Sequence, residues 1–156
     1  MATIQRFEDL VMFKKARELT KAIYKSFASC KDYGFRDQIQ RASVSVVSNI
    51  AEGFESGTKQ EFLNYLYIAK ASAGEVRAQL YVAHDIGYVN IETFKHLNMC
   101  AEECSRLIAS FAKKLKAGGR DGLQWKREPR KDIAAELMQE AGYVRLPSGQ
   151  VVEKPK

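Results

Sequence analysis

The sequence predicts an all-α protein, a four-helix bundle followed by a separate basic tail. Apolar residues repeat at helical spacing through residues 1–117, and all three prolines lie beyond that stretch. Short predicted connections make consecutive helices antiparallel neighbours, so the expected topology is up-down-up-down. The chain has 156 residues, enough for one compact domain and too few for two of ordinary size.

The first helix is expected at about residues 8–29 and the second at about residues 36–51. The apolar stripe of the first consists of Met12, Ala16, Leu19, Ile23 and Phe27. The stripe of the second consists of Phe35, Ile39, Ala42, Val46 and Ile50. Gly34 and Gly53 are expected to mark the two ends of the second helix.

The third helix is expected at about residues 58–86 and the fourth at about residues 90–116. Thr58 and Glu61 have the spacing of a capping box, Gly87 is the expected stop, and Asn90 is the cap candidate of the fourth helix. The core seam of the third helix is Phe62, Leu66, Ala69, Ala73, Val76, Leu80 and Ala83. The stripe of the fourth is Phe94, Leu97, Ala101, Cys104, Ile108, Phe111 and Leu115.

The third predicted helix is also apolar on the side opposite its core seam. This second face consists of Leu63, Tyr67, Ala71, Gly74, Ala78 and Tyr81. A helix that is apolar on two sides needs cover on both, and the small residues allow close approach of another backbone. We favour a homo-oligomer interface here, and the alternative is a mildly apolar face exposed to solvent.

The tail, residues 118–156, is basic and is expected to be either docked or mobile. Residues 130–141 have the pattern of a short amphipathic helix. Residues 143–146 and 150–153 flank a Pro-Ser-Gly turn and resemble a hairpin.

Composition and motifs argue against secreted, membrane and enzymatic proteins. No run reaches the roughly 18 apolar residues of a membrane span, and the first ten residues carry no signal-peptide core. The three cysteines include no Cys-x-x-Cys pair, so a cytoplasmic protein is expected. With two histidines, no glycine-rich phosphate loop and no nucleophile elbow, we expect no catalytic residues and no cofactor.

The best metal candidate is a set of three residues at successive i, i+4 positions: His96, Cys100 and Cys104. A structural zinc site needs four ligands and usually takes two of them from a second element. Cys104 also lies on the core stripe, where a thiol behaves as a small hydrophobe. We therefore predict no metal.

A polar stripe on the second helix has a counterpart on the third, and the two can face each other or a subunit boundary. The stripe of the second helix consists of Gln38, Arg41, Ser45, Ser48, Asn49 and Glu52, and that of the third consists of Glu61, Ser72, Glu75 and Gln79. Of these, Gln38, Arg41, Ser45, Asn49, Glu52 and Glu75 are the candidate members of a polar network. Arg41 is positioned to pair with Glu75. The favoured interpretation is a structural network that sets register between helices or subunits, and the alternative is a ligand-binding or RNA-contacting groove.

A basic stripe lies on the first helix, about 180° from its core residues. It consists of Lys14, Arg17, Lys21 and Lys25. Such a stripe can follow a phosphate backbone, and an oligomer would multiply it. In the tail, the candidate nucleic-acid contacts are Arg127, Arg130 and Lys131. The net charge of +6 agrees with such a partner, although a solvated lysine face is the common alternative.

Three segments resemble one family. They are residues 6–10 (RFEDL), residues 38–53 with the specific run SNIAEG, and a pattern around Glu61, Phe62, Ile68, Ala69, Ser72 and Glu75. Over about residues 6–115 the chain is similar to bacterial 23S rRNA intervening-sequence proteins. Members commonly carry Trp where this chain has Phe13, and Ile-Pro where it has Val46 and Val47. Without that proline, the second helix should be more continuous.

The resemblance implies a homopentamer of four-helix bundles. It also implies similarity to the accessory variability protein of diversity-generating retroelements, a basic pentamer that engages nucleic acid and a reverse transcriptase. It supplies no catalytic residues. We therefore expect a non-enzymatic, oligomeric RNA- or DNA-binding accessory protein. The alternative is a protein-interaction scaffold that binds a partner enzyme such as a reverse transcriptase.

Overall fold

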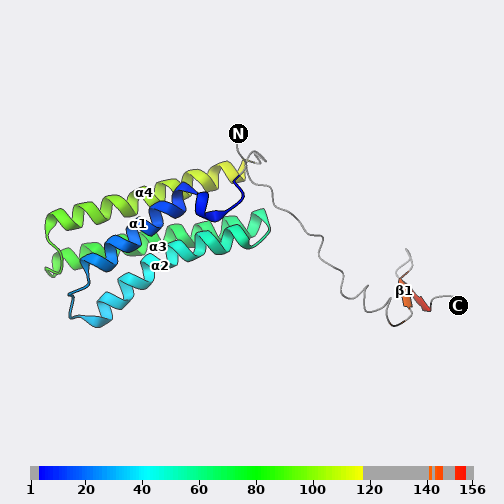
Figure 1. Ribbon diagram of the computed structural model, residues 1–156, viewed down its shortest axis with the longest axis horizontal. Helices are drawn as coiled ribbons and strands as arrows, with labels where there is room; N and C mark the ends of the chain where they lie inside the picture. The colour runs from blue at the N-terminus through cyan, green and yellow to red at the C-terminus, as the bar shows by residue number, and fades with distance from the viewer. Residues whose placement is uncertain (1–3, 118–140, 142, 146–149, 154–156) are drawn as a thin grey trace. The chain divides into compact units, whose positions relative to one another are not determined.

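The computed structural model describes residues 4–117, 141, 143–145 and 150–153. The chain divides into two compact units, Met1–Trp125 and Lys126–Lys156. In the first unit four long α-helices lie side by side (Figure 1). A 3₁₀ turn at Phe7–Asp9 precedes α1 (Val11–Ser26), α2 (Tyr33–Glu55), α3 (Lys59–Asp85) and α4 (Ile91–Lys116).

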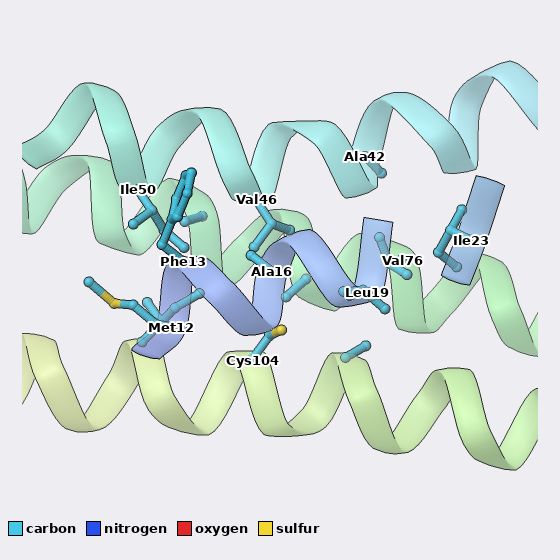
Figure 2. Close-up of a cluster of buried hydrophobic side chains, with 14 of the residues drawn as sticks. Met12, Phe13, Ala16, Leu19, Ile23, Ala42, Val46, Ile50, Val76 and Cys104 are labelled. Carbon is cyan, nitrogen blue, oxygen red and sulfur yellow. The ribbon is translucent and has the colours of Figure 1, made fainter. Parts of the chain in front are cut away.

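The core of the bundle forms where all four helices meet. Each helix packs against the next along the chain, and α1 also packs against α4. The core stripes predicted from the sequence are confirmed: nearly all of their members are buried, and Phe35, Phe94 and Phe111 are partly buried against them. Figure 2 shows the α1 side chains, including Met12, Ala16 and Leu19, directed between the other helices.

The predicted ends of α2 are wrong at both glycines. The helix begins at Tyr33, one residue before Gly34, because the Asp32 carboxylate caps it by accepting the Phe35 amide at 3.0 Å. It continues through Gly53 to Glu55, and Gly53 is buried. The helix is continuous past Val46 and Val47, as the absence of proline predicted.

The start of the first helix also differs from the prediction. Leu10 adopts an extended conformation between the 3₁₀ turn and α1, so the helix begins at Val11 and not near Glu8. The Leu10 side chain is fully buried, and the Phe7 ring packs edge-on against Phe13 at 4.9 Å between centroids. This entry segment therefore belongs to the core although it is not α-helical.

The N-caps predicted for α3 and α4 are confirmed. The capping box of α3 is only half formed, because the Glu61 carboxylate accepts the Thr58 hydroxyl at 2.6 Å and not the Thr58 amide. The Thr58 hydroxyl oxygen accepts the Glu61 amide at 3.2 Å, and the Asn90 side chain accepts the Thr93 amide at 2.8 Å. Gly87 ends α3 with a φ of 81°, where its amide bonds to the His84 carbonyl. The Tyr88 amide bonds to the Ala83 carbonyl, which completes a Schellman motif.

In the second unit, β1 (Tyr143–Arg145) pairs with β2 (Val151–Glu153) in an antiparallel hairpin, as the sequence pattern indicated. The register places Tyr143 opposite Glu153. The amphipathic helix expected at residues 130–141 lies almost entirely outside the described residues. Within the described part of the chain, no helix is long and apolar enough to cross a membrane.

Candidate nucleic-acid interface and neighbouring surfaces

The basic stripe of α1 lies on the solvent side of the bundle. Lys14, Arg17, Lys21 and Lys25 are all exposed, whereas the opposite face of the same helix is buried. The positions step by three or four residues, so each cation lies about 5 Å further along the helix than the one before. Among the described residues, none of the four forms an ion pair, so their charges remain available.

A groove of about 830 Å³ lies between α1 and α2, with the basic stripe along one side. Three of the four stripe residues line it. The complete lining is Lys14, Arg17, Glu18, Thr20, Lys21, Tyr24, Val44 and Val47. We call this the α1/α2 groove. The sequence predicted the cations but not the groove, because Val44 and Val47 come from a different helix.

Thr20 joins the two walls of the α1/α2 groove. Its hydroxyl lies 3.0 Å from the Ala16 carbonyl in its own helix and 3.0 Å from the Ser43 carbonyl of α2. Ser43 is itself buried, and its hydroxyl donates to the Gln40 carbonyl at 2.7 Å. These contacts hold α1 and α2 in fixed register beneath the groove.

Glu18 is the single acidic residue in the groove lining, and its charge is balanced from outside the groove. Lys15 Nζ lies 3.0 Å from the Glu18 carboxylate and 3.8 Å from that of Glu103 on α4. The hydrogen bond to Glu18 is the main reason that the pKa of Lys15 is raised. With Glu18 paired, the groove presents a net positive charge.

The polar stripes of α2 and α3 touch at one point, between Ser45 and Ser72. The Ser45 and Ser72 hydroxyls are 2.9 Å apart, and Asn49 Nδ2 donates to the Ser45 carbonyl and hydroxyl at 2.8 and 3.0 Å. The Ser72 hydroxyl also donates to the Ile68 carbonyl. This small network lies at the boundary between the two helices and supports the structural interpretation of those residues.

Four of the polar-stripe residues line an open groove of about 540 Å³, the α2/α3 groove: Gln38, Arg41, Ser45 and Glu75. Its lining is Gly34, Asp37, Gln38, Arg41, Ala42, Ser45 and Glu75. The expected ion pair between Arg41 and Glu75 is not formed among the described residues, although both line the groove; Glu75 accepts Gln79 Nε2 at 3.1 Å instead. Glu52, also placed on this stripe, is exposed and does not line the groove.

The second face of α3 is exposed with one exception. Tyr67 is 45% exposed and Tyr81 is 53% exposed, and Ala71, Gly74 and Ala78 lie between them on the surface. Leu63 is only 5% exposed and belongs to the core of its own bundle, because it lies one helical step from buried Leu66. We call the five exposed residues the α3 outer face.

A partly buried ion pair between α3 and α4 was missed by the sequence analysis. Arg77 lies 2.9 Å from the Glu102 carboxylate, and Asn98 donates to the same oxygen at 3.3 Å. Arg77 Nε and Asn98 Oδ1 are buried without a hydrogen-bond partner. No sequence signal identified this pair, because the two charges are 25 residues apart and lie on different helices.

The residues considered for a metal do not assemble into a site. Cys104 is fully buried, and burial raises the pKa of its thiol to about 12. Cys100 Sγ and His96 Nε2 are 4.0 Å apart near the surface. Within the described residues, no group of three or more metal-ligand side chains is present. The tail candidates Arg127, Arg130 and Lys131 lie outside the residues that the structure describes.

The fold and its surfaces define a four-helix bundle protein with a basic groove and a second apolar face. Residues 8–110 match the family of 23S rRNA-intervening sequence proteins, and the chain belongs to that family. This confirms the resemblance seen in the sequence motifs.

A solved structure from Bacteroides thetaiotaomicron supports the same assignment. It is a protein with unknown function from the S23 ribosomal protein family, 27% identical in sequence, with a TM-score of 0.63. The match covers 66% of this chain and 99% of that one. No curated protein matches the sequence. The shared part is therefore the bundle, and the tail lies largely beyond it.

Proposed function

We propose that this protein is a non-enzymatic, oligomeric nucleic-acid-binding protein that contacts phosphates through the α1 basic stripe. The observation that carries the proposal is the row of four exposed cations on α1, unpaired within the described chain and adjacent to an open groove. Phosphate contacts of this kind release counterions and supply most of the affinity in non-specific binding. The family name refers to intervening sequences of 23S rRNA, so RNA is the first nucleic acid to test.

The proposed assembly is a homo-oligomer, a pentamer by the family resemblance, of up-down-up-down bundles. Only three residues separate α2 from α3, and they span at most about 10 Å, whereas α2 is about 35 Å long. A connection that short supports an antiparallel arrangement. The α3 outer face supports association, because two tyrosines and three small residues remain exposed on it within the described bundle. Each tyrosine ring also has a partner in the bundle, since the Tyr81 ring packs edge-on against Phe94 and Lys116 lies over the Tyr67 ring.

The test is binding of a structured RNA at two salt concentrations. Four phosphate contacts predict that affinity falls about 50-fold between 50 and 200 mM salt for single strands, and about 150-fold for a duplex. Changing Lys14, Arg17, Lys21 and Lys25 to Glu should abolish the binding. Binding that is absent at low salt, or that survives these four changes, would overturn the proposal.

A matched control variant separates the contribution of the α1 basic stripe to binding from the effect of the protein's net charge. Lys31, Lys59, Lys95 and Arg106 are also exposed and lie outside the α1/α2 groove. Changing these four to Glu alters the net charge by the same amount as the stripe variant. This control should keep most of the affinity and most of the salt dependence. Equal losses in the two variants would mean that only the overall charge matters.

The α2/α3 groove supports a second candidate, a protein-interaction scaffold that binds a partner enzyme such as a reverse transcriptase. Arg41 and Glu75 line this groove with opposite charges that do not pair with each other. A partner with complementary charges would pair with both. The discriminating experiment is a pull-down after nuclease treatment, in which capture of one stoichiometric protein that is lost with Arg41→Glu favours the scaffold.

A further inference from the structure

The lining of the α1/α2 groove is not purely basic. Tyr24 is 46% exposed and Val44 is 39% exposed, and together with Val47 they give the groove an apolar part beside the cations. Phosphate contacts alone do not need such a surface. A ligand that uses the whole groove therefore carries negative charge on one side and flat apolar groups on the other.

Tyr24 is placed to act together with the cations. It lies three residues after Lys21, which is one turn of α1, and directly before Lys25. Aromatic rings flanked by Lys or Arg are typical of surfaces that bind single strands, because bases stack on the ring while phosphates meet the charges. The contacts of Thr20 with α1 and α2 hold the walls in place, so the groove is formed before any ligand binds.

We infer that the α1/α2 groove binds single-stranded nucleic acid, with phosphates on Lys14, Arg17 and Lys21 and an unpaired base stacked on Tyr24. This inference rests on the proposed function and narrows it to unpaired nucleotides. The occupant follows from charge complementarity, since the unpaired cations complement the phosphates of a nucleic-acid strand. A duplex keeps the faces of its bases stacked inside, so it offers this groove phosphates, sugars and base edges but no free base face. Only an unpaired strand also covers Tyr24, Val44 and Val47.

The test compares a single-stranded RNA of about 12 nucleotides, a length within the usual site sizes, with its duplex. The full-length protein is titrated with each labelled probe at low salt, and a single-stranded DNA of the same sequence forms a third arm. Tighter binding of single strands than of the duplex is expected. A preference for RNA over DNA would indicate contacts to the 2′-hydroxyl in addition.

Three tyrosine variants locate the stacking contact. Tyr24→Ala should weaken single-strand binding about five-fold or more, while Tyr24→Phe, which retains the ring, should bind like the wild type. Tyr33→Ala is the control, because Tyr33 is 66% exposed and does not line the groove. The duplex affinity of Tyr24→Ala should be unchanged.

The outcomes distinguish this inference from the proposed function. If single strands and duplex bind equally, or if Tyr24→Ala has no effect on single strands, the inference is wrong while stripe-dependent binding stands. A loss in Tyr24→Ala that is equal for both probes also overturns it. If neither probe binds at low salt, both the inference and the proposed function are wrong. A protein segment is then the remaining candidate ligand of the groove.

Discussion

Gly53 lies at a close contact between α2 and α3. A Cβ added at this position would be 2.7 Å from the Phe62 ring and 2.7 Å from Tyr65 Cβ. Tyr65 Cβ is attached directly to the backbone and cannot move without shifting α3. Glycine is therefore required here for helix packing and not for a turn, which explains why it lies inside the helix.

We predict that Gly53→Ala destabilises the bundle. Alanine favours a helix by about 1 kcal/mol over glycine, but overpacking against fixed neighbours costs typically 1–3 kcal/mol. A net loss of about 1 kcal/mol in the free energy of unfolding is expected, measured by chemical denaturation. The matched control is Gly34→Ala, whose added Cβ lies at an ordinary 3.7 Å from Asp32 and should leave stability unchanged or raised. A Gly53→Ala variant as stable as the wild type would contradict the packing argument.

At the site, individual residues differ in how far the sequence predicted them. The exposure of Lys14 and Arg17 was predictable, because helical periodicity places them opposite the core stripe. The role of Thr20 and Val44 in the α1/α2 groove was not, because it depends on which side of α2 faces α1. Periodicity identifies the inward face of a helix but not its neighbours on either flank.

At the scale of elements, the buried stripes of all four helices follow from their 3.6-residue period. Helix boundaries depend on local hydrogen bonds, and a single capping side chain can set where a helix begins or ends. The Asn90 and Thr58 caps were recognisable because such residues precede apolar runs. The start of α2 was not, because Asp32 caps a helix whose first turn contains Tyr33 and Gly34. The extended Leu10 likewise interrupts a periodic pattern without a breaker residue.

The Asp32 carboxylate joins two segments of the bundle. One of its oxygens accepts the Phe35 amide at 3.0 Å and the other accepts the Tyr88 hydroxyl at 2.8 Å, which links the start of α2 to the connection between α3 and α4. The pKa of Asp32 is lowered, mainly by the hydrogen bond from the Phe35 amide and next by the one from the Tyr88 hydroxyl. Both contacts favour the ionised carboxylate.

This coupling predicts a pH-dependent stability. Because the pKa of Asp32 is lower in the folded state, its contribution is complete above the unfolded value, about pH 4, and is lost as the pH falls through the folded value. Asp32→Asn retains a capping side chain without the charge. The stability advantage of the wild type over Asp32→Asn, from urea unfolding, should therefore shrink between neutral pH and about pH 3. A constant difference across that range would show that Asp32 is not the titrating group.

At the scale of the whole molecule, the α3 outer face is an apolar surface of the isolated bundle that remains exposed to solvent. The core seam of α3 is buried within the bundle, whereas Tyr67, Tyr81 and the small residues between them remain exposed on the described bundle. Ile68 and Val82, also about half exposed, widen the apolar surface. A sister chain is the proposed cover, since the small residues permit close backbone contact.

We predict that Ala71→Glu combined with Ala78→Glu reduces the native mass to that of a monomer. Both alanines are exposed on the isolated bundle, so the substitutions leave the core intact while placing unpaired charges in the proposed interface. Native mass spectrometry measures the assembly, and circular dichroism checks that the helices remain. Ser29→Glu with Ser110→Glu, at exposed positions elsewhere, gives the same change in charge and should retain the oligomer.

The same variant tests whether assembly contributes to nucleic-acid binding. Its α1 basic stripe is unchanged, so each bundle keeps its own phosphate contacts. An oligomer presents several stripes to one strand and gains affinity through effective concentration, without any new contact. The monomeric variant should therefore bind a long RNA more weakly than the wild type and bind a short one equally. If the wild-type protein is already a monomer in solution, both the loss of assembly and the weaker binding of long RNA lose their basis. If the two proteins bind long RNA equally, only the contribution of assembly to binding is contradicted.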